Sequence, residues 1–396
     1  MNKKKLKVTI LSPTFCKGGI ERAYLLGQVL QKLHCEVKIL GFLFEGGIYP
    51  LPPQQLFLDW VRGGNYPQIL VSAMQLLGKI DGDIIYAVKP LPTSFGIALL
   101  KKLSACKPVI LDIDDWELSW HGGDSWQYHP TLKQLARDIL KKDGALRNPT
   151  HPLYLQWMEK LVNRADAVTV HTQFLQQRFG GTYLPNGKDT ELFDPAKFDP
   201  DTSRKNYALS QYRVLMFPGA PRPHKGIEDI LIALDYLNQP DLRLVIVGGN
   251  PYDDYDEQLM VKWGRWIIKL PPMPVEQMPE IIAAAHVIVV PQRDTPIARA
   301  QFPLKLTDGM AMAKPVLATR VGDIPEILGE TGYLVEPSCP QQLAEQIELI
   351  FQNLASANER GKKARERCIE RYSIGAMAAM LEPVLASLDS PSRFFK

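Results

Sequence analysis

The fold is decided at residues 7–42, which read KVTILSPTFCKGGIERAYLLGQVLQKLHCEVKILGF. The apolar runs Lys7–Pro13 and Glu36–Phe42 have the length of buried strands, and between them Glu21–Leu33 has apolar residues at helical spacing. A strand, a helix and a second strand in this order predict a parallel pair of strands covered by a helix.

The same alternation continues along almost the whole chain and predicts two α/β domains in tandem. Further buried strands are expected at Asp83–Val88, Pro108–Ile113, Ala167–His171, Arg213–Phe217, Leu242–Gly248, His286–Pro291, Pro315–Ala318 and Tyr333–Val335. Helices of the second series are expected at Gly226–Leu237, Val275–Ala285 and Leu304–Ala313.

The turn-rich stretch Pro185–Gln211 separates the two series of strands. We therefore expect Rossmann-like domains at residues 1–200 and 201–372. The remaining residues, 373–396, should contain a last helix over Ser373–Leu388 that is broken near Pro383.

Composition is that of a folded globular protein, with 45% hydrophobic and 22% charged residues among 396. No apolar run approaches the ~18 residues of a spanning helix, and the basic N-terminus is followed by only a short apolar run, which indicates a first strand and not a signal peptide. The five cysteines are widely spaced without a C-x-x-C pair, which favours a reducing compartment and offers no metal cluster. These features predict a cytoplasmic protein.

Charge is distributed unevenly. Residues 1–190 hold 23 Lys and Arg against 16 Asp and Glu, a net charge of +7, whereas the remainder has a net charge of −4. A basic first half favours anionic partners such as a membrane surface or a phosphate-bearing acceptor, and ordinary variation between domains explains it equally well. The segment Trp116–Leu161 mixes aromatic and basic residues, which suits either a membrane interface or, more commonly, a loop insertion packed on its own domain.

Two strand-to-helix turns have the composition of an anion site. In the first, Gly18 and Gly19 precede a helix, where backbone N–H groups can approach an anion; the spacing matches neither a dinucleotide fingerprint nor a P-loop. In the second, Arg222 and Lys225 precede the next predicted helix, and two such cations suit a diphosphate leaving group. A solvated basic turn is the alternative for the second.

Asp308 is a carboxylate inside an otherwise apolar predicted helix, Leu304–Ala313. Burying it costs free energy unless it has a partner. Either it accepts hydrogen bonds from the two hydroxyls of a ribose, or it is a satisfied aspartate on the helix surface.

Taken together and in order, these motifs resemble the "group 1" family of retaining glycosyltransferases, family four, over nearly the whole chain. The resemblance is carried by Gly18-Gly19, Asn163–Val168, Tyr183–Asp189, Lys225-Gly226, Val245–Gly249, Met310–Thr319 and Gly322–Ile327. It implies the GT-B fold, in which two Rossmann-like domains face a cleft and the last helix crosses back to the first domain.

The resemblance implies a hexosyltransferase that retains anomeric configuration and uses neither a metal nor a cofactor. The donor is a nucleotide-diphosphate sugar, and the acceptor is a glycan, a lipid-linked molecule or a small molecule; no nucleic acid is expected. A peripheral contact of the basic first half with the inner membrane face is left open.

Carried over onto matching positions, Lys225 grips the donor diphosphate, and Asp308, one turn after Lys305, holds the ribose. Lys305 is expected on the donor side as well. Gly18 and Gly19 belong to the loop beside the donor phosphates and the acceptor.

The chain departs from the family pattern in three places, two of which are single positions. Ala220 replaces an arginine, for which Arg222 is close enough to substitute. Ala300 replaces the first acid of a paired motif, and Asp294 is the expected replacement as a sugar contact. These departures also leave open a nucleotide-sugar epimerase of the same architecture and a catalytically silent sugar-nucleotide-binding protein.

In place of a common histidine, the first domain has Asp112, Asp114 and Asp115. They suggest acceptor binding, with Asp114 as a base for the acceptor hydroxyl, or a structural turn. His171 ends the next strand and is expected on the acceptor side.

Overall fold

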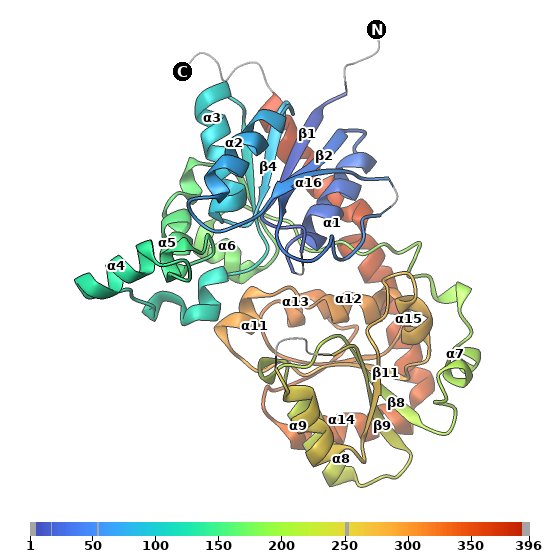
Figure 1. The fold of residues 1–396 in the computed structure, drawn as a ribbon. Helices are drawn as coiled ribbons and strands as arrows, with labels where there is room; N and C mark the ends of the chain where they lie inside the picture. Colours follow the sequence, from blue (N-terminus) through green and yellow to red (C-terminus); the bar gives the residue numbers. More distant parts are fainter. Residues whose placement is uncertain (1–4, 17, 54, 250–252, 390–396) are drawn as a thin grey trace. The chain divides into compact units, whose positions relative to one another are not determined.

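The computed structural model describes residues 5–16, 18–53, 55–249 and 253–389. Its chain forms two compact units: an N-terminal unit of residues 1–186 together with 377–396, and a C-terminal unit of residues 187–376. Each unit is a parallel sheet covered by helices (Figure 1), which confirms the predicted α/β fold class.

The division after Asn186 lies 14 residues before the expected boundary between residues 200 and 201. Its cause is the segment after Gly187, which packs with the C-terminal unit: Phe193 is buried in that unit's core, and the backbone N–H of Lys188 donates to the carbonyl of Tyr372.

The N-terminal sheet has the strand order β3-β2-β1-β4-β5-β6-β7, and all pairs are parallel. Its strands are β1 (Lys7–Ser12), β2 (Glu36–Leu43), β3 (Phe57–Arg62), β4 (Ile84–Val88), β5 (Val109–Ile113), β6 (Ala167–Val170) and β7 (Thr182–Tyr183). Its helices are α1 (Glu21–Lys32), α2 (Ile69–Lys79), α3 (Ile97–Ala105), α4 (Leu132–Leu140), α5 (Pro152–Lys160) and α6 (Gln173–Phe179).

The C-terminal sheet has the order β10-β9-β8-β11-β12-β13 and is also parallel. Its strands are β8 (Arg213–Pro218), β9 (Leu242–Val247), β10 (Ile267–Leu270), β11 (Val287–Val290), β12 (Val316–Thr319) and β13 (Tyr333–Val335). Its helices are α7 (Pro200–Asn206), α8 (Ile227–Leu237), α9 (Tyr255–Trp263), α10 (Met278–Ala283), α11 (Pro296–Ala300), α12 (Leu304–Ala311), α13 (Ile324–Leu328), α14 (Pro340–Gln352) and α15 (Leu354–Tyr372).

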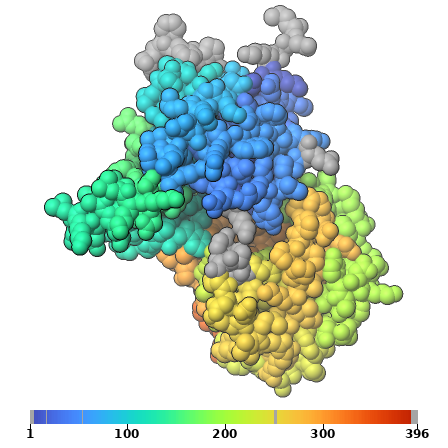
Figure 2. All heavy atoms as spheres, in the orientation of Figure 1, coloured from blue at the N-terminus to red at the C-terminus, as the bar shows by residue number. Residues whose placement is uncertain are grey.

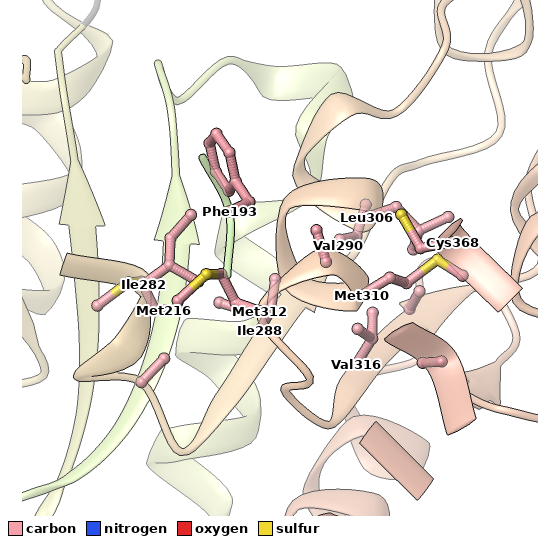
Figure 3. Packing of buried hydrophobic residues seen from close by; sticks show 14 of the residues in the cluster. Phe193, Met216, Ile282, Ile288, Val290, Leu306, Met310, Met312, Val316 and Cys368 are labelled. Atoms are coloured by element: carbon pink, nitrogen blue, oxygen red, sulfur yellow. The ribbon is translucent and has the colours of Figure 1, made fainter. Parts of the chain in front are cut away.

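One face of the C-terminal sheet packs on α12 and α15 (Figure 3). Met216 of β8 and Ile288 of β11 lie in the same fully buried cluster as Leu306 and Met310 of α12. At Gly309 a Cβ would lie 2.9 Å from a side-chain carbon of Ile288, so glycine lets α12 approach the sheet closely. This packing holds the start of α12 at the edge of the sheet where the strands end.

The last helix, α16 (Ile374–Asp389), corrects the expectation of a break near Pro383, because the helix continues through that residue. A proline inside a helix costs roughly 3 kcal/mol. Burial of Leu381, Val384 and Leu388 on one face offsets that cost. From residue 377 onward α16 belongs to the N-terminal unit, as expected for a helix that returns to the first domain.

Both sheets reverse their strand order at one point, between β1 and β4 in the first and between β8 and β11 in the second. In open α/β sheets, ligands bind outside the carboxyl ends of the strands at such a point. The residues after these four strands are therefore the candidate ligand-binding positions in each unit. Among the helices of the described ranges, none is long and apolar enough to cross a membrane.

Candidate functional site

The turn between β8 and α8 has a backbone that requires glycine at two places. Gly219 has φ +136° and Gly226 has φ +69°, both in the region that L side chains rarely adopt. A Cβ at Gly226 would also lie 1.9 Å from the carbonyl oxygen of Pro291, so the segment after β11 packs directly on this turn. The two strands at the reversal point thus contribute adjoining backbone.

Three cationic side chains lie around this turn, and they come from two elements. Arg222 precedes a short 3-10 helix (Pro223–Lys225) that ends at Lys225, and the Lys225 Nζ donates to Gln301 Oε1 at 2.7 Å. Lys305 reaches the same turn from the first turn of α12: its Nζ lies 4.6 Å from the Phe217 ring centroid and would be 2.9 Å from a Cβ at Gly219. The structure therefore brings together the expected residues Arg222, Lys225 and Lys305.

Burial and the neighbouring cations together lower the pKa values of two side chains at this turn, His224 and Lys305. Burial, followed by the charges of Lys225, Arg222 and Lys305, lowers the pKa of His224 to about 3. Burial and then Arg222 lower the pKa of Lys305 to about 8, against the opposing effect of Asp308. The turn thus concentrates positive charge in a place where solvent screens it poorly, which favours an anionic ligand.

Asp308 lies on α12 one turn after Lys305 and is almost fully buried. It forms an ion pair with Lys188, whose Nζ also lies 3.9 Å from the Phe193 ring centroid. The partner required by a buried carboxylate is therefore present within the protein, and a ribose contact would be an addition to that pair.

Asp294, the expected sugar contact, lies in the loop after β11. Its two carboxylate oxygens accept hydrogen bonds from Arg299, each at 2.6 Å, and this contact lowers the pKa of Asp294. Both side chains are exposed to solvent, so this ion pair contributes little to the stability of the fold. Ala300 is fully buried on α11.

In the N-terminal unit the turn after β1 holds Gly18 and Gly19 before α1. Gly18 has φ +76°, and a Cβ there would meet only open space. A Cβ on Gly19 would lie 2.4 Å from the Thr14 methyl group, and the carbonyl of Gly19 accepts a hydrogen bond from the Ser12 hydroxyl at 3.0 Å. The loop is thus closely packed at Gly19 and open at Gly18.

Asp112, expected on the acceptor side, is fully buried at the end of β5. Arg22 of α1 donates to both of its oxygens, with Nε–Oδ2 at 2.8 Å and Nη2–Oδ1 at 2.9 Å, and the Thr169 hydroxyl donates to Oδ1 at 2.7 Å. Arg22 also donates to Asn186 Oδ1 at 2.7 Å. This network ties α1 to the sheet, which is a structural role for Asp112.

Asp114 and Asp115 lie just beyond β5, beside a cluster around Lys89. Lys89 follows β4 with φ +67° and forms ion pairs with Asp114, at 3.4 Å, and with Glu117. Burial opposes ionisation of Asp114, but Lys89, His171 and Arg22 together outweigh it and lower the pKa of Asp114.

Two further carboxyls of this cluster are harder to ionise. Burial raises the pKa of Asp115 to about 6, although Trp120 Nε1 donates to it at 3.1 Å. Burial likewise raises the pKa of Glu21, at the start of α1, and Asp114 adds to that rise. His171, almost fully buried, contacts Asn186 through Nδ1 at 3.3 Å.

Sequence reasoning did not identify Lys89, Glu117, Lys188 or Gln301. Lys89 had a signal, because it directly follows a buried strand that lies beside the reversal point of the sheet. Lys188 lies in the motif Tyr183–Asp189, but nothing in that motif pointed to Asp308 as its partner, and Gln301 had no signal; packing between distant parts of the chain brings each to its partner. Among the residues that the structure describes, no group of three His, Cys, Asp or Glu side chains is placed to hold a metal ion.

Comparison with known proteins identifies relatives of this chain. Residues 212–353 match the family model of glycosyl transferases group 1. A GDP-mannose-dependent alpha-(1-6)-phosphatidylinositol monomannoside mannosyltransferase of Mycolicibacterium smegmatis is 25% identical over 81% of this chain and 80% of the relative. A D-inositol 3-phosphate glycosyltransferase of Corynebacterium glutamicum is 28% identical, over 56% of this chain and 57% of the relative's length.

Among solved structures, HepE of Anabaena in complex with UDP has a TM-score of 0.72 at 18% identity and covers 96% of this chain and all of that chain. The glycosyltransferase WaaG has a TM-score of 0.65 at 14% identity and covers 97% of this chain and all of that chain. These likenesses confirm the GT-B fold. With the curated relatives, they show that the chain is a glycosyltransferase, and residues 212–353 are the part that matches group 1.

Proposed function

We propose that this glycosyltransferase moves a hexose from a nucleotide-diphosphate sugar to a hydroxyl of a glycan, a lipid-linked molecule or a small molecule, with retention of anomeric configuration and without a metal ion or cofactor. The observation that carries the proposal is the convergence of Arg222, Lys225 and Lys305 on the turn after β8. The relatives support the donor class, since one is GDP-mannose-dependent and a fold neighbour was determined in complex with UDP-glucose.

The chemistry follows from where charge develops. As the bond from the sugar to the β-phosphate breaks, negative charge grows on the leaving diphosphate. Fixed cations in a poorly screened turn stabilise that charge more than they stabilise the ground state. Lys225 is positioned by Gln301 and Lys305 by the Phe217 ring, so neither has to reorganise as the charge appears. These residues supply the stabilisation that a divalent metal would otherwise provide.

For the acceptor we propose the end of the N-terminal sheet, where Asp114 and Glu117 lie around Lys89. Because its pKa is lowered, Asp114 is ionised at neutral pH and is suited to accept a hydrogen bond from an acceptor hydroxyl. Retention of the anomeric configuration is supported by the resemblance to the group 1 family. In that family the leaving phosphate helps to deprotonate the acceptor hydroxyl.

The test is a panel of nucleotide sugars, beginning with GDP-mannose and UDP-glucose, incubated with and without cell lipid extract and soluble sugars. We expect acceptor-dependent release of the nucleoside diphosphate, undiminished by EDTA, and a product with the anomeric configuration of the donor by NMR. Loss of activity in EDTA with recovery in Mn²⁺ or Mg²⁺ would refute metal independence. An epimerised sugar released without an acceptor would identify an epimerase, and binding without turnover would identify a silent binding protein.

A further inference from the structure

Helix α4 presents its apolar side to solvent. Leucine, isoleucine and alanine occupy positions with the i, i+3, i+4, i+7, i+8 spacing of one helical face: Leu132, Leu135, Ala136, Ile139 and Leu140. Leu132 is 87% exposed, Leu140 76% and Ile139 52%. In a globular protein this face of a surface helix normally packs on the core, so the orientation of α4 is inverted.

The inversion arises because α4 is attached to its unit by a polar residue. Asp138, on the side of the helix opposite the apolar face, is buried, and the Tyr128 hydroxyl donates to its Oδ2 at 2.8 Å. Tyr128 is in turn held by a stacked Trp126 ring and an edge-on His151 ring. The aromatic residues of this segment therefore anchor the helix by its polar side.

Helix α4 is also stabilised locally, so that it does not depend on burial of its apolar face. Thr131 and Gln134 form a capping box: the Thr131 hydroxyl accepts from the Gln134 N–H, and the Gln134 side chain accepts from the Thr131 N–H at 2.9 Å. Such a box stabilises the first turn of a nine-residue helix that would be marginal alone. In Figure 1 the helix stands at the edge of the N-terminal unit, away from its sheet, and the same segment projects from that unit's surface in Figure 2.

The charge around this apolar face is strongly basic. Lys133, Arg137, Lys141 and Lys142 are all exposed on or just after α4; Asp138 is buried and pairs with Arg137 at 3.0 Å, and Asp143 is the exposed acid of residues 131–143. An exposed apolar stripe bordered by lysine and arginine is the pattern of a helix that lies in the interface of an anionic bilayer. A protein partner would need an equally long apolar groove with acidic rims.

We propose that α4 docks the N-terminal unit on an anionic phospholipid surface, with Leu132, Ile139 and Leu140 inserted below the headgroups and the flanking basic residues on the lipid phosphates. The proposal goes beyond glycosyl transfer, and its test needs no substrate. Sugar transfer could fail and docking hold, or the reverse, so the two are tested separately.

The experiment measures co-sedimentation of the full chain with two kinds of vesicle, at about physiological ionic strength. One kind is phosphatidylcholine alone, and the other contains about 30% phosphatidylglycerol. We expect binding to the anionic vesicles, weakened by high salt. Leu132→Ser/Ile139→Ser/Leu140→Ser should lower the partition coefficient by at least about 10²-fold, from three apolar side chains no longer buried in lipid. Lys133→Gln/Lys141→Gln/Lys142→Gln should lower it by about 10²-fold on anionic vesicles.

A matched triple variant in the other unit, Val261→Ser/Val275→Ser/Leu349→Ser, also removes three exposed apolar side chains and should bind as the wild type does. All variants should keep the wild-type melting temperature, since each changed side chain is exposed. The proposal would be overturned if the wild type bound neutral and anionic vesicles equally, or if the α4 triple variant bound as well as the wild type. It would also be overturned if the matched variant lost as much binding as the α4 triple variant. A wild-type dimer, seen by sedimentation velocity, that the α4 triple variant turns into a monomer would overturn it as well.

Discussion

Asp308 of α12 and Lys188 form an ion pair in the C-terminal unit, and the exposed fractions of the two side chains are only 12% and 16%. The pair provides the partner that a buried carboxylate requires, and it joins α12 to the segment that begins the unit. A ribose contact by Asp308 therefore has to be separated experimentally from this structural contribution.

We predict that Asp308→Ala weakens binding of both the sugar nucleotide and the free nucleoside diphosphate by roughly 10- to 150-fold, because both contain the ribose and a hydrogen bond to a charged group is worth about 1.5–3 kcal/mol. Titration calorimetry measures both affinities. Lys188→Met breaks the same ion pair and serves as the control: it should lower the melting temperature while leaving the two affinities close to wild type. Equal ligand affinities in the two variants would assign Asp308 a structural role alone.

For Asp294→Ala we expect weaker binding of the sugar nucleotide alone, by roughly the same 10- to 150-fold, with the nucleoside diphosphate unaffected. The structure supplies a control in Arg299, which occupies both oxygens of Asp294. Arg299→Ala releases the carboxylate and should not weaken the sugar nucleotide. If Asp294→Ala reduces the affinity for both ligands equally, Asp294 does not contact the sugar of the donor.

Removing the Lys225 ammonium should lower kcat by about 10²–10³-fold, the scale for loss of one electrostatic stabiliser of the transition state. The comparison is between Lys225→Ala and Gln301→Ala in steady-state kinetics with the donor identified by the panel. Gln301 only positions the lysine, through the 2.7 Å hydrogen bond, so its loss should be the milder of the two. An unchanged kcat in Lys225→Ala would show that the diphosphate lies elsewhere.

Affinity for the donor should fall as pH rises through about 8, because the pKa of Lys305 is lowered to about 8 and the neutral amine no longer attracts the diphosphate. Lys305→Arg stays charged over this range and should therefore remove the loss of donor affinity at alkaline pH. Lys305→Met should bind the donor weakly at every pH. A wild-type affinity that is flat from pH 7 to about 9.5 contradicts the assignment.

The same titration acts on stability with the opposite sign. The folded-state pKa lies below the ordinary value of 10.5, so between about pH 8 and 10.5 the unfolded chain binds more protons than the native state. The contribution of Lys305 to the free energy of unfolding should therefore rise over that interval. Urea denaturation of the wild type and of Lys305→Met at several pH values isolates this contribution.

Asp112→Ala should reduce the free energy of unfolding by about 3–5 kcal/mol, because it leaves the Arg22 guanidinium buried without its carboxylate. Urea denaturation measures the loss. Asp115→Ala is the neighbouring comparison and should destabilise far less, since burial raises the pKa of the Asp115 carboxyl to about 6 and its charge is therefore less favourable in the folded protein than in water. A stable Asp112→Ala protein with a raised KM for the acceptor would instead support the acceptor-side role expected from sequence.

The sequence by itself determined the two parallel sheets and the turns that bear the anion site. Buried parallel strands must be apolar along their whole length, so strands such as Ile84–Val88 and Val287–Val290 are visible as short apolar runs. Strand β3 was not visible, because Phe57–Arg62 lies at the sheet edge with most of its side chains partly or fully exposed. Gly226 before α8 was equally legible, since its positive φ favours glycine and a Cβ there would lie 1.9 Å from the Pro291 carbonyl oxygen.

Only the tertiary structure decided what neighbouring side chains do. Asp112, Asp114 and Asp115 are of one residue type within four positions, yet one is buried on Arg22, the next pairs with Lys89, and the third is hard to ionise. The reason is that the end of a strand directs successive side chains into different surroundings, and those surroundings come from distant parts of the chain.

The orientation of α4 shows the same limit. Its periodicity predicts a helix with an apolar face, but periodicity is identical whether that face points inward or outward. In the structure the Tyr128 hydroxyl donates to Asp138 on the polar side of the helix, while the leucines at its two ends face solvent.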